Sequence, residues 1–290
     1  MALPSSMSNV LGLPHAAAEL KLRPGMSEYS LVIHRVRNLG DAIQTIALSR
    51  HLPAAHGVFR HRLNHAEEHR LLIFNGLLDK DPPPTRGVKC LFAGASGPHF
   101  RTKEYMRWMA RSPYPIGARD PFTLRQMQSK GLRSVLIGCA TLTLPRYDGP
   151  RRGVYSVDWP GPGQQLTHRI SRRETLRQQW DRATEMLAKY RTAEAVYTSR
   201  LHVALPCLAY GTPVWIANPE RGAWHPWRFG ILEELGLPYE TLVTADLSPW
   251  AQRYLEFLQT HVEKGIESGE PKMPLAPAME RGWRPGWWRW

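Results

Sequence analysis

An arginine and a histidine stand two positions apart in residues 198–202, Thr-Ser-Arg-Leu-His. Residues 193–197 before them are small, β-branched and aromatic, which predicts a short strand. Apolar residues then recur at helical spacing up to Gly211. Proline has no N–H, and this costs a helix no hydrogen bond only in its first turn, where N–H groups have no partner within the helix. Because of Pro206, the helix should therefore begin near His202. Arg200 and His202 therefore lie between a strand end and a helix start, where α/β sheets bind ligands and anions are attracted. This placement suggests a phosphorylated or carboxylated substrate.

A second arginine occupies a similar junction. Residues 116–118 read as the end of a strand, Asp120 as the N-cap of the next helix and Pro121 as its first residue. Arg119 is thus a cation between a strand and a helix. Arginine suits bidentate capture of a phosphate or carboxylate, and the alternative is a structural arginine that bridges the sheet edge.

Three histidines, His61, His65 and His69, stand four residues apart and could share one helix face. Imidazoles in this order could bind zinc. However, arginines crowd the same segment, and three ligands on successive turns of one helix converge poorly, so a solvated basic face is the expected state. No metal site is predicted.

Strand and helix patterns alternate along the chain and predict an α/β fold with two doubly wound domains that face a cleft. Residues 1–28 read as a tail, residues 29–148 as the first domain, residues 149–268 as the second, and residues 269–290 as a second tail. In the first domain, a strand at 31–33 leads through Gly40 into a helix for which Asp41 is the expected N-cap. In the second, Ser171 and Glu174 form a capping-box pattern before a helix with a clear 3.6-residue period.

The composition limits the classes of protein. A hydrophobic content of 42% allows a real core, and no run of 18 apolar residues is present, so nothing is expected to span a membrane. We find no secretion signal, and the three cysteines form no CxxC pair, which indicates a reducing cytoplasm. The formal charge of +13 attracts polyanions, but no nucleic-acid-binding signature accompanies it.

The last nine residues, 282–290, interleave tryptophan and arginine, a pattern that suits a membrane interface. A tail that packs on the rest of the chain is the alternative. Anionic membrane surfaces are therefore a candidate partner, at the inner face of the plasma membrane.

Four segments in order resemble the polysaccharide pyruvyl transferase family. They are residues 38–44 (Asn-Leu-Gly-Asp-Ala-Ile-Gln), residues 117–124 with Gly-Ala-Arg-Asp at their start, residues 198–202, and residues 211–214 (Gly-Thr-Pro-Val). The matches span roughly residues 30 to 236. One stretch departs, because Cys139 stands where many members carry an aspartate-proline pair.

The resemblance implies two Rossmann-like domains arranged as in B-type glycosyltransferases. It also implies phosphoenolpyruvate as co-substrate without a further cofactor, and a pyruvate ketal on a sugar of a lipid-linked exopolysaccharide repeat unit as product. His202 would be the general acid or base, and Arg119 and Arg200 would hold the donor. Further substrate-binding residues would be Asn38, Gly40, Asp41, Gln44, Ser199 and, as a cation about twenty residues after the histidine, Arg221. Trp224 and Trp227 could stack on a sugar or belong to the core.

Two other functions remain open at this level. A B-type glycosyltransferase that uses a nucleotide-sugar would have the same architecture. A non-enzymatic protein that binds anions or a membrane surface would account for the charge and the Trp/Arg tail.

Overall fold

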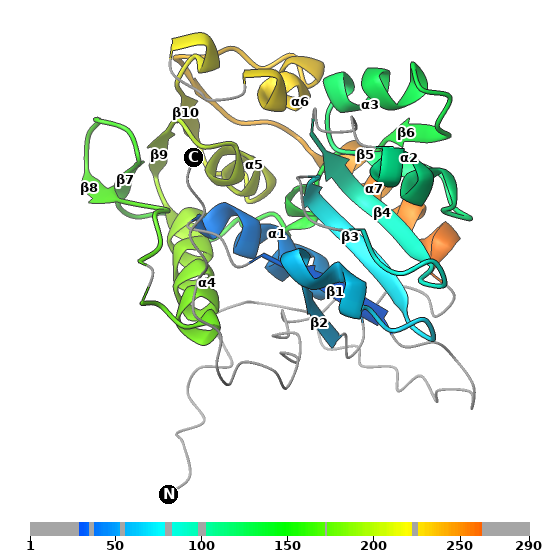
Figure 1. Ribbon diagram of the computed structural model, residues 1–290. Helices are drawn as coiled ribbons and strands as arrows, with labels where there is room; N and C mark the ends of the chain where they lie inside the picture. The colour runs from blue at the N-terminus through cyan, green and yellow to red at the C-terminus, as the bar shows by residue number, and fades with distance from the viewer. Residues whose placement is uncertain are drawn as a thin grey trace, which may run out of the picture.

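A computed structural model of the protein shows two β-sheets and the helices that connect their strands (Figure 1). The structure describes residues 29–34, 38–52, 56–78, 83–97, 103–171, 173–221 and 226–262. Both predicted tails, residues 1–28 and 269–290, lie outside these ranges, and so does Trp224. The Trp/Arg segment 282–290 is part of the second tail.

The first sheet has six parallel strands in the order β2-β1-β3-β4-β5-β6. Its strands are nearly continuous apolar runs, as expected of a parallel sheet that is covered on both faces. The strands are β1 Tyr29–Ile33, β2 His56–Phe59, β3 Leu71–Leu77, β4 Cys90–Ser96, β5 Ile116–Ala118 and β6 Ser134–Leu136. The helices of this half are α1 Leu39–Ser49, α2 Lys103–Ala110 and α3 Pro121–Gln128, with 3-10 turns at Arg60–His65 and Ala140–Thr143.

The second sheet has five strands in the order β11-β10-β9-β7-β8, and only β11 is antiparallel to its neighbour. The strands are β7 Val154–Val157, β8 Gln164–Leu166, β9 Ala195–Thr198, β10 Val214–Ile216 and β11 Leu242–Val243. The helices are α4 Leu176–Thr192, α5 Leu201–Ala209, α6 Gly230–Glu234 and α7 Ser248–His261, with 3-10 turns at Pro219–Arg221 and Pro226–Phe229.

One apolar core joins the two sheets. Leu31 and Ile43 from the first half belong to the same buried cluster as Val196 and Val214 from the second. Helix α1 contacts both α4 and α5, which places it between the two halves (Figure 1). Helix α7, the last in sequence, returns to the first half, where the hydroxyl of the fully buried Tyr254 donates to the Ala93 carbonyl at 3.0 Å. The α/β class with parallel sheets is therefore confirmed.

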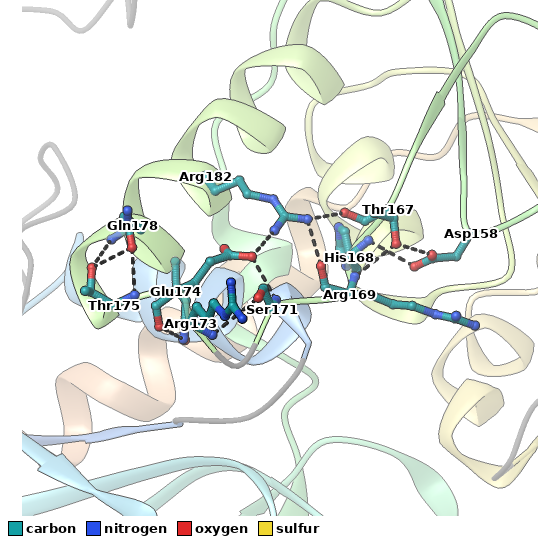
Figure 2. A network of polar contacts seen from close by, with 11 residues as sticks. Asp158, Thr167, His168, Arg169, Ser171, Arg173, Glu174, Thr175, Gln178 and Arg182 are labelled. Atoms are coloured by element: carbon teal, nitrogen blue, oxygen red, sulfur yellow. Dashed lines mark hydrogen bonds and ion pairs between the residues drawn. The ribbon is translucent and has the colours of Figure 1, made fainter. Parts of the chain in front are cut away.

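Helix starts show where local patterns misled the sequence analysis. Asn38, rather than Asp41, is the N-cap of α1, and its side chain accepts a hydrogen bond from the Gly40 N–H. The capping box of α4 is Thr175 with Gln178, four residues after the predicted pair. Ser171 and Glu174 still form a turn with two mutual hydrogen bonds. The Ser171 N–H donates to Glu174 Oε1 at 2.8 Å (Figure 2), and the Glu174 N–H donates to the Ser171 carbonyl at 3.2 Å. Two capping patterns in tandem therefore made the boundary ambiguous.

The predicted helix face with three histidines does not form. His61 and His65 belong to a 3-10 turn that ends at His65, and His69 follows in a separate turn beside Glu67. Among the described residues, no group of three or more His, Cys, Asp or Glu side chains could hold a metal ion. No described helix is long and apolar enough to cross a membrane.

We expect Gly117→Ala to destabilise the fold. A Cβ atom there would lie 2.3 Å from Ile137 Cδ1 and 2.8 Å from the Phe92 carbonyl oxygen, and that carbonyl cannot move without disturbing the sheet. Overpacking of this kind costs about 1–3 kcal/mol in the free energy of unfolding, which urea denaturation measures. The matched control is Gly230→Ala, whose Cβ would meet only Pro121 Cδ at 3.5 Å. Equal stability of the two variants would contradict this packing.

Candidate functional site

His202 lies at an irregular point of the α5 backbone. The helix begins at Leu201 after Arg200 as N-cap, one residue before the predicted start. Pro206 is inside the helix rather than in its first turn, so it supplies no N–H for the His202 carbonyl. His202 accordingly has non-helical backbone angles, φ −84° and ψ 20°. Its side chain is buried, and its Nε2 has no hydrogen-bond partner in the part of the chain that the structure describes.

Arg119 is completely buried at the end of β5. Its Nη1 donates to Gln44 Oε1 at 3.3 Å, its Nη2 donates to the Ser96 hydroxyl, and its Nε lies 3.9 Å from Asp120 Oδ2 without a hydrogen bond. Asp120 is the N-cap of α3, as the sequence predicted. It is occupied there, because its Oδ1 accepts from the Thr123 N–H and its Oδ2 from Ser96. The guanidinium of Arg119 therefore keeps one buried N–H that no described residue accepts from.

The N-terminal turn of α1 joins Arg119 to His202. Gly40 lies against the histidine, since a Cβ at residue 40 would be 3.1 Å from His202 Cβ and 3.2 Å from its Nδ1. Gln44, which accepts from Arg119, donates to Asp41 Oδ1 at 3.2 Å. Of the residues that the sequence analysis selected in this segment, Gly40 thus lies against His202 and Gln44 contacts Arg119, while Asp41 contacts Gln44.

Arg228 joins this group, and the sequence analysis missed it. Its Nε is shielded from solvent and has no hydrogen-bond partner among the described residues. Burial, and after it the positive charge of Arg119, lowers the pKa of Arg228 to about 10. Burial also lowers the pKa of His202 well below its usual value, with the charges of Arg119 and Arg228 as the next causes. The signal available in the sequence was weak, because Arg228 follows one of several tryptophans in a segment that shows no helix or strand period.

Arg200 is engaged elsewhere. Its Nε donates to Asp158 Oδ2 at 3.0 Å, and its side chain is about one third exposed. Asp158 also accepts from the Thr167 hydroxyl at 2.6 Å and the His168 N–H at 3.0 Å (Figure 2). Ser199 donates to the Asp158 carbonyl. Arg200 still contributes its charge to the group, since it lowers the pKa of Arg228.

The remaining candidates differ in what the structure describes. Arg221 ends a 3-10 turn, and its side chain lies outside the described residues, as does Trp224. Trp227 stacks on Phe122 with ring centroids 5.0 Å apart, a contact between the second half and α3. Asn38 is engaged as the α1 cap and in a bridge to Arg169.

We name Arg119, His202 and Arg228 the cation cluster. Among the described residues, Nε of both arginines and Nε2 of the histidine have no hydrogen-bond partner, and the charge of Arg119 lowers the pKa of both other members. The carboxylates of Asp41 and Asp120 partly offset the positive charge at Arg228. Buried donors without partners are the groups that can bind an anion with several oxygens. The fold and the cation cluster thus define an α/β protein with a buried group of cations.

Comparison with known proteins gives the family. A model of the family described as polysaccharide pyruvyl transferase matches residues 38–219. The chain belongs to the polysaccharide pyruvyl transferase family. No curated protein matches the chain. One solved structure that is similar is an uncharacterized protein from Klebsiella pneumoniae subsp. pneumoniae NTUH-K2044, with 13% identity and a TM-score of 0.49, over 76% of this chain and 94% of that one.

Buried histidines should make the protein sensitive to acid. Burial lowers the pKa of His34 to about 4 and that of His168 to about 3, and the pKa of His202 is also well below 6.5. The unfolded chain binds protons as the pH falls through about 6.5, whereas the folded chain does not, so stability is complete above this pH and falls below it. At pH 5.5 we expect a loss of about 1 kcal/mol in unfolding free energy for each histidine.

Urea denaturation at pH 7.5 and pH 5.5 measures this loss. His168→Asn, whatever its stability at pH 7.5, should lose less on acidification than the unchanged protein. His69→Gln is the control, since it removes a histidine whose side chain is 69% exposed. The same acid loss in both variants would show that His168 titrates normally in the folded protein.

Proposed function

We propose that the protein transfers the pyruvyl group of phosphoenolpyruvate to a pair of hydroxyl groups on a sugar and forms a cyclic pyruvate ketal. The observation that carries this proposal is the cation cluster, with its unpaired buried nitrogens on Arg119, Arg228 and His202. Phosphoenolpyruvate has a phosphate and a carboxylate on one small carbon skeleton. Two guanidinium groups next to one imidazole match two anionic groups next to one reacting carbon.

The donor would neutralise the cluster. Charges of Arg119 and Arg228 hold the pKa of His202 down, after burial, so the free imidazole is neutral near pH 7. A bound anion offsets this repulsion and raises the pKa of His202. The histidine then carries a proton only when the donor is in place, which suits a general acid.

The reaction balances with His202 as a proton relay. The imidazolium donates its proton to C3 of phosphoenolpyruvate, which becomes a methyl group, and C2 becomes electrophilic. A sugar hydroxyl adds to C2 and returns its proton to the imidazole. The C2–O bond to phosphate breaks, a second hydroxyl closes the ring, and its proton leaves with the phosphate. Proton transfer by a positioned histidine contributes about 10²–10⁴-fold to the rate, and the positioning of donor and diol contributes further.

The acceptor in this proposal is a sugar of a lipid-linked exopolysaccharide repeat unit. The family's name supports a polysaccharide acceptor, and the net charge of +13 supports work beside anionic lipids at the inner face of the membrane. The two sheets would correspond to Rossmann-like domains that together hold donor and acceptor.

A binding comparison tests the donor. Phosphoenolpyruvate at 100 times its Kd should stabilise the protein by about 3 kcal/mol in a thermal-shift assay, and UDP-sugars should not. Incubation with phosphoenolpyruvate and pyrophosphate-linked oligosaccharides should add to the acceptor the mass of one pyruvate less one water. Stabilisation by a nucleotide-sugar alone would replace this function with glycosyl transfer.

Substitutions in the cation cluster should separate binding from chemistry. Arg228→Met should weaken phosphoenolpyruvate binding about tenfold or more, because one charge-assisted contact is lost, without destabilising the free protein. His202→Asn should lower kcat about 10²–10⁴-fold while the protein stays folded. Arg177→Met is the matched control, because the Arg177 side chain is 71% exposed and pairs with Asp181. Turnover that survives His202→Asn would point to binding without catalysis by this residue.

A further inference from the structure

The outer face of the second sheet carries a continuous row of side chains in register. Gln165 of β8 pairs with Ser156 of β7, Ser156 pairs with Tyr197 of β9, Tyr197 pairs with Trp215 of β10, and Trp215 pairs with Leu242 of β11. Residues directly opposite one another in neighbouring strands point to the same face. The row therefore crosses all five strands, with polar residues at one end and large apolar ones in the middle and at the other end.

The opposite face of this sheet is the one that the core uses. Val196, Val214 and Ile216, which alternate with the row along their strands, belong to the central buried cluster, together with residues of α4 and α5. In Figure 1, α5 lies between this sheet and α1. Tyr197 and Trp215 belong to none of the buried clusters of the described residues and are only half-buried. Leu242 is 45% exposed.

The loop after β7 adds a third ring to this row. Trp159 lies with its ring centroid 5.4 Å from that of Trp215, and Tyr197 lies 6.0 Å from Trp215, all within the usual range for aromatic contacts. Gly161 lets the loop pack closely on the sheet, because a Cβ there would be 2.6 Å from Ser156 Oγ and 3.3 Å from Tyr197 Cβ. We name Trp159, Tyr197, Trp215 and Leu242 the aromatic platform.

The platform is continuous with the residues that flank the cation cluster. Asp158, directly before Trp159, accepts from Arg200 through its carboxylate and from Ser199 through its carbonyl. Trp159 follows the carboxyl end of β7, and Ser199 and Arg200 follow that of β9. Ligands of open α/β sheets bind at the carboxyl ends of the strands.

We propose that the aromatic platform binds the carbohydrate chain of the acceptor. Half-buried aromatic rings offer flat apolar faces to the C–H faces of pyranose rings, and their edges and the exposed Gln165 offer polar contacts. With the exposed Leu242, these neighbouring rings form a partly exposed apolar surface, and such surfaces mark interaction sites. The family's polysaccharide acceptor makes a glycan the occupant that fits both properties, and the proposal rests on the transferase function proposed above.

Titration with defined oligosaccharides tests the platform without any turnover. Hexasaccharides of glucose, galactose and mannose are added to the full chain in the absence of phosphoenolpyruvate, and binding is measured by calorimetry. At least one series should bind. Trp159→Ala and Trp215→Ala should each weaken that binding about tenfold or more, because aromatic anchors supply most of the affinity of such surfaces. Trp159→Ala is the variant less able to disturb folding, since Trp159 lies in a loop.

The control is Trp250→Ala, which removes a half-buried indole that lies on α7 beside Arg253. Glycan binding should be unchanged in this variant, and phosphoenolpyruvate binding should be unchanged in all three. If no glycan binds while phosphoenolpyruvate does, or if binding survives both platform substitutions, the platform proposal is wrong and the donor proposal stands. If glycans bind through the platform but phosphoenolpyruvate does not bind, the donor proposal is wrong. Changes confined to self-association, or to contacts of residues 263–290, would assign the platform to a second copy or to that segment instead.

Discussion

The structure depends on two arginines and a histidine that keep buried nitrogen atoms without a hydrogen-bond partner among the described residues. Arg119 has no exposed surface; it donates to Gln44 and Ser96, and the nearby Asp120 carboxylate already accepts two other hydrogen bonds. The charge of Arg119 lowers the pKa of Arg228, and the carboxylates of Asp41 and Asp120 partly offset this effect. Burial of like charges costs free energy unless a counter-charge is present. A bound anion would supply partners for these donors, which is what the donor site proposed above requires.

The position of α1 decides whether the two halves can form this site together. The Leu39 N–H donates to the His168 carbonyl at 2.9 Å, and Asn38 forms a bridge with Arg169. These contacts bind the start of α1 to the second half, while Gly40 packs on His202 and Gln44 holds Arg119. The segment 167–171 is itself fixed by Arg182, which donates to the carbonyls of Thr167 and Arg169 and pairs with Glu174 (Figure 2). A half-buried ion pair between α4 and the turn before it thereby contributes to the position of α1 beside the buried His202.

Local patterns predicted the elements but not the partners of the charges. The strands and helices with apolar periods were identified, as were Asp120 as the α3 cap and Arg119 at a strand end, because these features depend on neighbours in sequence. The short strands β2, β8 and β11 were missed, because His-Gly-Val-Phe, Gln-Gln-Leu and Leu-Val form no apolar run that stands out from the neighbouring loops. Arg228 and Asp158 could not be recognised because their roles depend on residues 42 to 109 positions away. The low pKa of His202 could not be predicted either, since it follows from burial and from two arginines that are distant in the sequence.

Asp158 explains why Arg200 and His202, two positions apart, have different surroundings. The kink at His202 turns its imidazole inward toward Gly40 and the cation cluster, whereas the carboxylate of Asp158 draws the Arg200 guanidinium outward toward the β7 loop. That loop adopts a left-handed backbone at Asp158, φ 50°, which ordinary side chains rarely accept and which the Thr167, His168 and Arg200 hydrogen bonds stabilise. One strained residue thus contacts Arg200, near the cation cluster, and directly precedes Trp159 of the aromatic platform. If the donor binds at the cation cluster and the sugar chain at the aromatic platform, Arg200 lies at the boundary between them. Its charge would then act on the reacting groups, while its position would depend on the loop that holds the acceptor.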